Sequence, residues 1–125
     1  MKLTILGTAT PYPRPDNPCS GYLVQHGRTS IWMDAGTGTL AELQRHIPLD
    51  RLDAIWISHA HADHSADLLT AYYALRFSDL TLPRPLPLIG PPRPGRSAGR
   101  LSRPSGSSRD SRGVRGHGNA RMAGT

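Results

Sequence analysis

The stretch at residues 57–67 reads ISHAHADHSAD, and it places three of the six histidines of this chain, with one aspartate, within six consecutive positions. A hydrophobic core has little use for such crowding, because each neutral imidazole brings one donor and one acceptor that must be paired when buried. A metal ion would use these groups together as ligands. A solvated histidine-rich turn is the alternative interpretation.

The spacing of these side chains favours two metal ions. Residues i and i+2 of an extended segment point to the same side, so His59 and His61 can converge on one ion. Asp63 keeps this parity, whereas His64 breaks it and requires the chain to turn into a helix near Ser65. Asp63 and His64 can then face a second ion, and paired divalent ions lie about 3.5 to 4 Å apart in such sites.

The ligand types favour zinc, and manganese or iron would also be compatible. No cysteine lies near the histidines, which argues against a closed structural zinc site. Four protein ligands spread over two ions leave open positions for a bridging water, which becomes a hydroxide nucleophile near neutral pH. The stretch therefore predicts a hydrolytic centre.

The segments around the motif predict a mixed α/β domain. Strands are expected at residues 2–6, 21–25, 29–34, 52–59 and 86–90, with a hairpin across the three-residue connection HGR at 26–28. The apolar run AIWI at 54–57 favours a strand buried on both faces. Helices are expected at 39–47 and from Ser65 to about residue 80, with Ser65 or Asp63 as N-cap and Tyr72 and Tyr73 as packing residues.

Charge is distributed unevenly along the chain. Residues 1–90 hold seven basic and eight acidic groups, net −1, whereas residues 91–125 hold eight and one, net +7, and together they give +6. The last segment consists mainly of Arg, Gly, Ser and Pro without apolar periodicity, so it cannot bury enough surface to offset its ordering entropy. We predict a folded region at residues 1–92 and a disordered tail at 93–125 that could bind RNA or another polyanion.

The single cysteine excludes an internal disulfide and favours a reducing, cytoplasmic location. We expect Cys19 to be a small buried thiol. His26 and His46 fall in a hairpin turn and at a helix end, where surface roles are expected. No apolar run approaches the roughly 18 residues that cross a bilayer, so no membrane partner is expected.

The sequence resembles the metallo-β-lactamase superfamily, whose signature H-x-H-x-D-H occurs here as His59, His61, Asp63 and His64. An opening strand ending LGTATP, a loop with NPCSGYLV, the DAG at residues 34–36 and a strand ending ISHAHADH follow in the order typical of its ribonuclease Z-like and phosphodiesterase members. The resemblance covers residues 1 to about 92. It implies an αββα sandwich of which only the first half is present.

The resemblance also implies roles for individual residues. His59 and His61 would ligate the first zinc, Asp63 and His64 the second, and Asp63 would also act as proton shuttle. Asp34 resembles the acid that orients a ligand histidine by accepting its other N–H, and the alternative is a simple Asp turn at the end of a strand. The implied activity is hydrolysis of a phosphodiester, in RNA 3′-processing or in cyclic nucleotides. Thioester and lactam substrates are the alternatives within the superfamily.

The sequence departs from the family pattern after residue 92. The family takes its remaining ligands from the second half, and His117, in RGHGN, is not expected to replace them. Fourteen arginines against one lysine suggest GC-rich coding DNA, so a truncated or frameshifted product is one explanation and a genuine basic tail is the other. The alternatives to an active enzyme are an inactive fragment and a basic-tailed nucleic-acid-binding protein. A half-sandwich would also leave an apolar face uncovered and favour aggregation or a homodimer.

Overall fold

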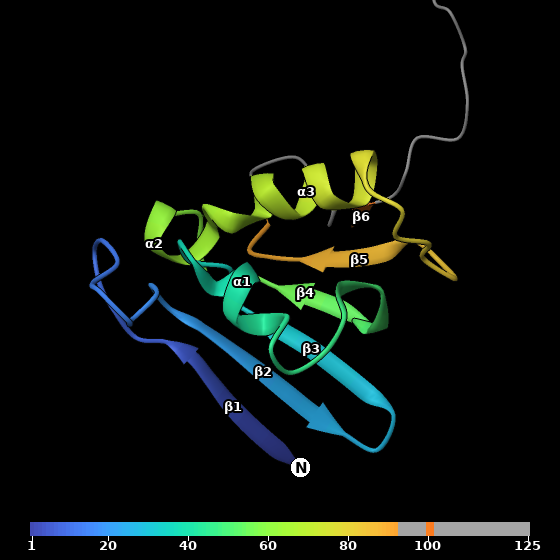
Figure 1. Ribbon diagram of the computed structural model, residues 1–125, viewed down its shortest axis with the longest axis horizontal. Helices are drawn as coiled ribbons and strands as arrows, with labels where there is room; N and C mark the ends of the chain where they lie inside the picture. The colour runs from blue at the N-terminus through green and yellow to red at the C-terminus, as the bar shows by residue number, and fades with distance from the viewer. Residues whose placement is uncertain (93–99, 102–125) are drawn as a thin grey trace, which may run out of the picture.

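A mixed sheet of six strands forms the scaffold of the chain (Figure 1). The computed structural model describes residues 1–92 and the backbone of Arg100–Leu101. Along the sheet, the strands keep their order in the sequence: β1 (Lys2–Gly7), β2 (Gly21–His26), β3 (Thr29–Met33), β4 (Ala54–Trp56), β5 (Leu86–Ile89) and β6 (Arg100–Leu101). The predicted tail at 93–125, with His117, lies outside the described residues except for β6.

The strand directions explain where the helices lie in the sequence. β1, β2 and β3 are antiparallel neighbours, whereas β3, β4 and β5 run parallel to one another. Parallel strands need crossover connections, and these contain α1 (Thr39–Leu43) and the 3₁₀ helix η1 (Leu49–Arg51) before β4, then α2 (Ala62–Ser65) and α3 (Asp67–Phe77) before β5. The α/β class expected from the sequence is confirmed. The hairpin is also confirmed, with a two-residue connection in place of three.

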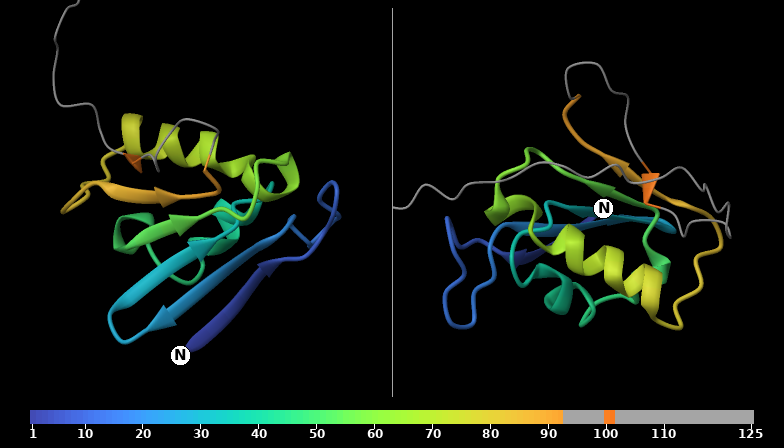
Figure 2. Two further views of the ribbon diagram at one scale, coloured as in Figure 1. Left: turned by 180° about the vertical axis from the view of Figure 1, so that it is seen from behind. Right: turned by 90° about the horizontal axis from the view of Figure 1, so that it is seen from above.

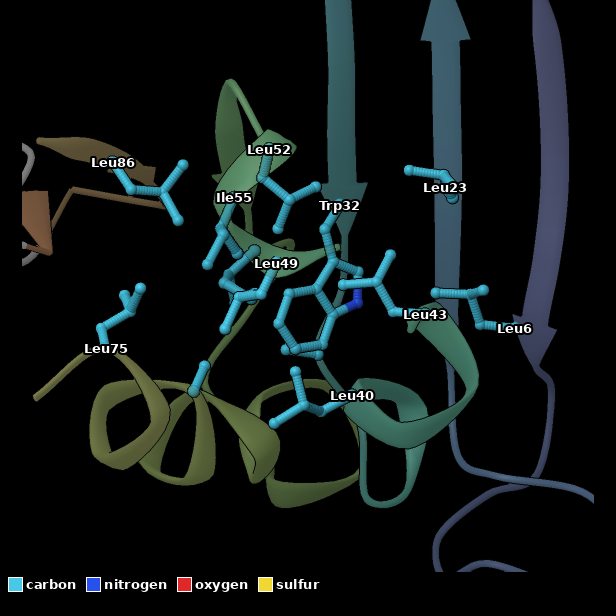
Figure 3. Packing of buried hydrophobic residues seen from close by; sticks show 13 residues of the cluster. Leu6, Leu23, Trp32, Leu40, Leu43, Leu49, Leu52, Ile55, Leu75 and Leu86 are labelled. Atoms are coloured by element: carbon cyan, nitrogen blue, oxygen red, sulfur yellow. The ribbon is translucent and has the colours of Figure 1, made fainter. Parts of the chain in front are cut away.

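The hydrophobic core lies between one face of the sheet and the helices (Figure 3). Leu23, Trp32 and Ile55 project from β2, β3 and β4 and are fully buried, and Leu43 of α1 meets them from the other side. Each such side chain contributes roughly 1.5 to 3 kcal/mol of hydrophobic stabilisation. This packing holds β3 and β4 in place, and so also the positions at which these two strands end.

The described helices leave the opposite face of the sheet uncovered (Figure 2). Apolar side chains on this face are exposed. Leu3 and Ile5 of β1 are 60% and 61% exposed, and Trp56 and Ile89 are 37% and 45% exposed. Register places Trp56 beside Ile89 in this face. The prediction that the run at 54–57 is buried on both faces is therefore wrong for Trp56, because the described helices cover only one face.

The helix predicted from Ser65 to about residue 80 is present as α3 over Asp67–Phe77, but the separate short helix α2 precedes it and the two meet at Ala66. The Asp67 N–H donates to the carbonyl of Ala35, at 2.9 Å, and so leaves the helical hydrogen-bond pattern. The predicted N-caps are also wrong, because His61 and Ala66 occupy the cap positions without side-chain cap bonds. The Ser65 hydroxyl donates instead to the backbone carbonyls of residues 60 and 61.

The outer face of α3 carries exposed aromatic side chains. Ala71 and Leu75, four residues apart, are the buried positions of this helix. Tyr72 and Tyr73 follow Ala71 directly, so the helix rotates them away from the buried face by about 100° and 200°. They are 39% and 55% exposed. The packing predicted for these tyrosines is limited to aromatic neighbours on α3 itself, where Tyr73 contacts Tyr72 and Phe77.

Three smaller expectations concern single residues and membrane spans. Cys19 is buried and free, and His26 and His46 are exposed, as predicted. The first helix ends at Leu43, short of the predicted residue 47. None of the described helices has the length and apolar composition needed to span a bilayer.

Candidate metal centre

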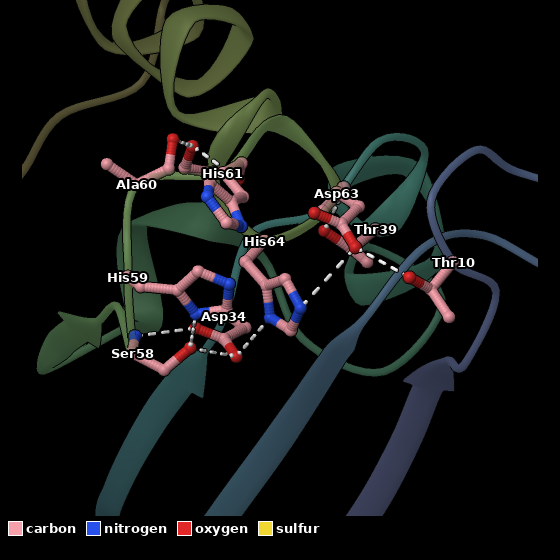
Figure 4. Close-up of polar contacts among 11 residues, drawn as sticks. Thr10, Asp34, Thr39, Ser58, His59, Ala60, His61, Asp63 and His64 are labelled. Atoms are coloured by element: carbon pink, nitrogen blue, oxygen red, sulfur yellow. Dashed lines mark hydrogen bonds and ion pairs between the residues drawn. The ribbon is translucent and has the colours of Figure 1, made fainter.

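The site lies where the parallel strands β3 and β4 end (Figure 4). Asp34 directly follows β3, and residues 58–61 follow β4 and lead into α2, which contains Asp63 and His64. Ligands of open α/β sheets bind in the crevice beyond the carboxyl ends of the strands, because loops from neighbouring strands converge there. The chain thus brings together side chains 24 to 30 residues apart in the sequence.

The turn at residues 34–36 is fixed by backbone contacts on both sides. Asp34 has φ 57°, a left-handed conformation that aspartate tolerates better than most residues. The Ala35 N–H donates to the carbonyl of His64 at 2.7 Å, and the Gly36 N–H to the carbonyl of Ser20 at 3.0 Å. A Cβ atom on Gly36 would overlap the carbonyl oxygen of Asp63, so the two segments can approach only because this residue is glycine.

The buried carboxylate of Asp34 accepts three hydrogen bonds. Its Oδ1 accepts from the Ser58 N–H at 2.7 Å, and its Oδ2 accepts from the Ser58 hydroxyl at 2.8 Å and lies 2.8 Å from His64 Nδ1. A carboxylate only accepts, so Nδ1 of His64 carries a proton, and in the neutral ring Nε2 keeps its lone pair. The predicted contact between Asp34 and a histidine of the motif is present. Its role toward a metal stays a prediction.

His59, Asp63 and His64 form a compact group of metal-ligating side chains. Each offers one ligand atom, and these atoms all lie within 4.8 Å of one another. His64 Nε2 lies 3.5 Å from Asp63 Oδ2, and the rings of His59 and His64 have centroids 4.1 Å apart. Three such donors from the loop after β4 and the start of α2, with the other nitrogen of His64 already bonded, fit a divalent cation with open coordination positions.

His61 lies outside this compact group. Its side chain is exposed, and its ring meets that of His59 edge-on with centroids 4.7 Å apart. The extended segment ends at His61, because α2 begins at Ala62, so the alternation that predicted Asp63 on the side of His59 and His61 does not continue. The expected pairing of His59 with His61 on one ion, and of Asp63 with His64 on another, stays a prediction.

The carboxylate of Asp63 forms a hydrogen bond with Thr10, in the loop after β1. The Thr10 hydroxyl donates to Asp63 Oδ2 at 2.8 Å, across 53 residues of sequence. This hydrogen bond lowers the pKa of Asp63, and the imidazoles of His64 and His59 lower it further, against an opposing effect of partial burial. Asp63 is therefore a carboxylate at neutral pH, available as ligand or proton acceptor.

Replacing Thr10 with valine should raise the pKa of Asp63 toward its ordinary value. Because the pKa in the folded state is depressed, Asp63 stabilises the fold above its unfolded-state pKa, and this contribution disappears as pH falls through the folded-state value. Thr10→Val should weaken that pH dependence. Carboxyl ¹³C NMR titration of Asp63 and urea unfolding at neutral and acidic pH measure the two effects.

Thr8→Val is the matched control for this experiment. Thr8 lies in the same loop, but its hydroxyl contacts Asn17 instead of Asp63. The control should leave the Asp63 titration unchanged. An equal shift in both variants would contradict a specific role of Thr10.

Sequence reasoning gave no role to two residues that contact the site, Ser58 and Thr10. Ser58 immediately precedes the motif, and its position at the end of the predicted strand was the only signal available. For Thr10 the sequence carries no local signal, because the contact with Asp63 depends on the folded arrangement of the loop after β1.

Comparisons with known proteins agree on one superfamily. The family model described as Metallo-beta-lactamase superfamily matches residues 14–119. The probable metallo-hydrolase YhfI of Bacillus subtilis (strain 168) is 40% identical over 68 residues, which are 54% of this chain and 28% of YhfI. Ribonuclease Z of Mycobacterium bovis (strain BCG / Pasteur 1173P2) is 34% identical over 97 residues, which are 74% of this chain and 34% of that enzyme.

A solved structure gives the same result. The crystal structure of the metallo-beta-lactamase fold protein YhfI from Bacillus subtilis superposes with a TM-score of 0.57 and 36% identity. The superposition covers 58% of this chain and 30% of YhfI. The chain thus spans about a third of the length of the curated relatives it matches.

Proposed function

Because the chain belongs to the metallo-beta-lactamase superfamily, we propose that its histidine motif is part of the centre of a metal-dependent hydrolase that cleaves phosphodiesters. The observation that carries the proposal is the group of His59, Asp63 and His64, with His64 oriented by a buried carboxylate. Similarity to a ribonuclease Z supports a phosphodiester in RNA over a thioester or lactam. Cyclic nucleotides are the second phosphodiester substrate considered.

His59, Asp63 and His64 would hold the cation, with zinc the preferred ion and manganese or iron compatible. Such an ion supplies Lewis-acid chemistry at a phosphate and lowers the pKa of a water molecule. Two ions belong to the same proposal, and the family resemblance places His59 and His61 on the first and Asp63 and His64 on the second. Asp63, ionised at neutral pH, would accept a proton from the attacking water as its oxygen bonds to phosphorus and the P–O bond to the leaving alcohol breaks, and Thr10 holds the Oδ2 atom of its carboxylate.

The alternative proposal treats the chain as a binding protein or an inactive fragment. The net charge of +7 on residues 91–125 favours contact with RNA or another polyanion. RNA binding that weakens with salt and is lost when residues 91–125 are deleted would support this alternative.

A homodimer formed through the exposed apolar face of the sheet, and a cytoplasmic location, also remain proposals.

The test measures zinc content and hydrolysis together. Because the family's second-half ligands are not expected in this chain, it should bind zinc weakly and turn over slowly. Its residual hydrolysis of an aryl phosphodiester should still exceed that of an aryl thioester or a β-lactam, and a chelator should stop it. His64→Ala should reduce zinc affinity and turnover by at least about 100-fold, the upper end of the roughly 10- to 100-fold cost of losing a group that only supports a ligand. Elemental analysis and spectrophotometric rates give the two numbers.

His46→Ala provides the matched control. His46 is exposed, lies outside the motif, and contacts Glu42 at 4.0 Å. This variant should keep the zinc content and the rate of the unmodified chain. Equal zinc content and turnover in the His64 and His46 variants would overturn the proposed function.

A further inference from the structure

We propose that Ser58 is a positioning residue that fixes which ring nitrogen of His59 carries the proton, acting between His59 and Asp34. Its hydroxyl oxygen lies 2.8 Å from Asp34 Oδ2 and 2.9 Å from His59 Nδ1 (Figure 4). The sequence motif begins one residue later, so this assignment adds a residue to the site. It rests on the proposed function at one point only, the use of the free nitrogen of His59 as a metal ligand.

The proton count at Ser58 decides the direction of both hydrogen bonds. A hydroxyl has one proton, and a carboxylate oxygen can only accept, so the Ser58 O–H donates to Asp34. The oxygen lone pair of Ser58 then faces His59 Nδ1, which must donate and therefore carries the hydrogen. In the neutral ring, Nε2 of His59 is left with its lone pair.

The reversed arrangement is unfavourable at this geometry. If Ser58 donated to His59, two oxygen atoms would face each other at 2.8 Å without a proton between them. The hydroxyl cannot easily turn away, because the backbone N–H of Ser58 is bonded to the other oxygen of Asp34 at 2.7 Å. Both oxygens of one carboxylate thus hold the main chain and the side chain of Ser58 together.

One carboxylate consequently sets two rings in the same state. Asp34 Oδ2 accepts directly from His64 Nδ1 and, through Ser58, acts on His59 Nδ1. Both Nε2 atoms are left as electron-pair donors, which is the form that binds a metal ion. The arrangement removes the cost of a tautomer change when a cation binds.

The tautomers can be read in the metal-free chain. Two-bond ¹H–¹⁵N correlation spectra of the ¹⁵N-labelled full chain, at a pH where the rings are neutral, distinguish Nδ1–H from Nε2–H at each histidine. His59 and His64 should both be Nδ1–H. Ser58→Ala should move His59 toward the Nε2–H form and leave His64 unchanged, and Ser58→Thr, which keeps the hydroxyl, should restore His59.

Ser65→Ala is the matched control, because the Ser65 hydroxyl in the same segment contacts only backbone carbonyls. It should change neither ring. Zinc affinity, measured by competition with a chromophoric chelator, should fall about tenfold in Ser58→Ala, which is the lower end of the cost of losing a group that supports a ligand. It should recover in Ser58→Thr.

An Nε2–H form of His59 in the unmodified chain would overturn the proposal, whether or not the variants fold. An unchanged His59 tautomer in Ser58→Ala would overturn it as well. Both observations are made without metal, so they are separate from a failure of the hydrolysis assay, which concerns the proposed function alone.

Discussion

Replacing Gly36 with alanine should lower the free energy of unfolding by about 3 kcal/mol or more. The added Cβ would overlap the carbonyl oxygen of Asp63 and would lie 2.7 Å from that of Ser20. Both obstacles are backbone atoms, so relief requires separating the turn after β3 from the start of α2. Overpacking costs roughly 1 to 3 kcal/mol where side chains can adjust, and more where backbone must move.

Urea unfolding followed by circular dichroism measures this loss, and Gly27→Ala is its control. Gly27 has a positive φ of 57°, which Gly36 does not have, and nothing lies within 4 Å of a Cβ placed there. The control should lose only the roughly 1 to 2 kcal/mol of left-handed strain. A loss at Gly36 no larger than that at Gly27 would contradict the close approach of backbone assigned to this position.

Replacing Asp34 with asparagine should reduce zinc affinity by about 10- to 100-fold. The Asp34 carboxylate accepts all three of its hydrogen bonds from donor groups. In asparagine an NH₂ group replaces one of the two oxygens, so in either orientation of the amide this NH₂ faces a donor. On the Ser58 backbone side it faces an N–H that cannot accept. On the other side it meets His64 Nδ1, which can accept only by moving its proton to Nε2, the atom assigned to the metal.

The expected result is therefore either a broken backbone contact or the wrong tautomer of His64. The variant should also lose about 1 to 3 kcal/mol of stability, because a buried donor is left unpaired. Zinc titration and the histidine correlation spectra measure affinity and tautomer on one sample. Unchanged zinc affinity in folded Asp34→Asn would contradict the role assigned to this carboxylate.

Asp53→Asn separates the loss of a carboxylate from the loss of the site. Asp53 accepts a hydrogen bond from the Ser30 N–H at 2.8 Å and pairs with Arg84, and neither partner belongs to the histidine group. Its replacement should lower stability and leave zinc affinity unchanged.

The sequence predicted the limits of β2 and β3 within one residue, because the glycine turn that joins these strands is a local signal. The strand expected at residues 52–59 was too long, since β4 covers only Ala54–Trp56. Burial of β4 was predicted incorrectly at Trp56, since exposure depends on which faces of the sheet are covered. The break between α2 and α3 was likewise hidden, because it arises from a bond between Asp67 and Ala35, 32 residues apart.

The candidate site shows the same division. The four residues of the motif were evident from composition and spacing, because they are close in sequence. Their arrangement was not, since the start of α2 at Ala62 turns Asp63 away from the direction that simple alternation assigns to it. Contacts from Thr10 and Ser58 depend on hydroxyl orientation in the folded chain, which spacing alone does not determine.

All three side chains of the compact group lie within six residues of one another, and this affects how metal binding can be measured. A denatured chain keeps these residues near each other and can itself chelate zinc. Zinc that binds only the native state raises the free energy of unfolding with the logarithm of zinc concentration. Zinc that also binds the unfolded chain cancels part of this gain. A thermal-shift assay would therefore understate the affinity of the folded site, and direct calorimetric titration is the appropriate measurement.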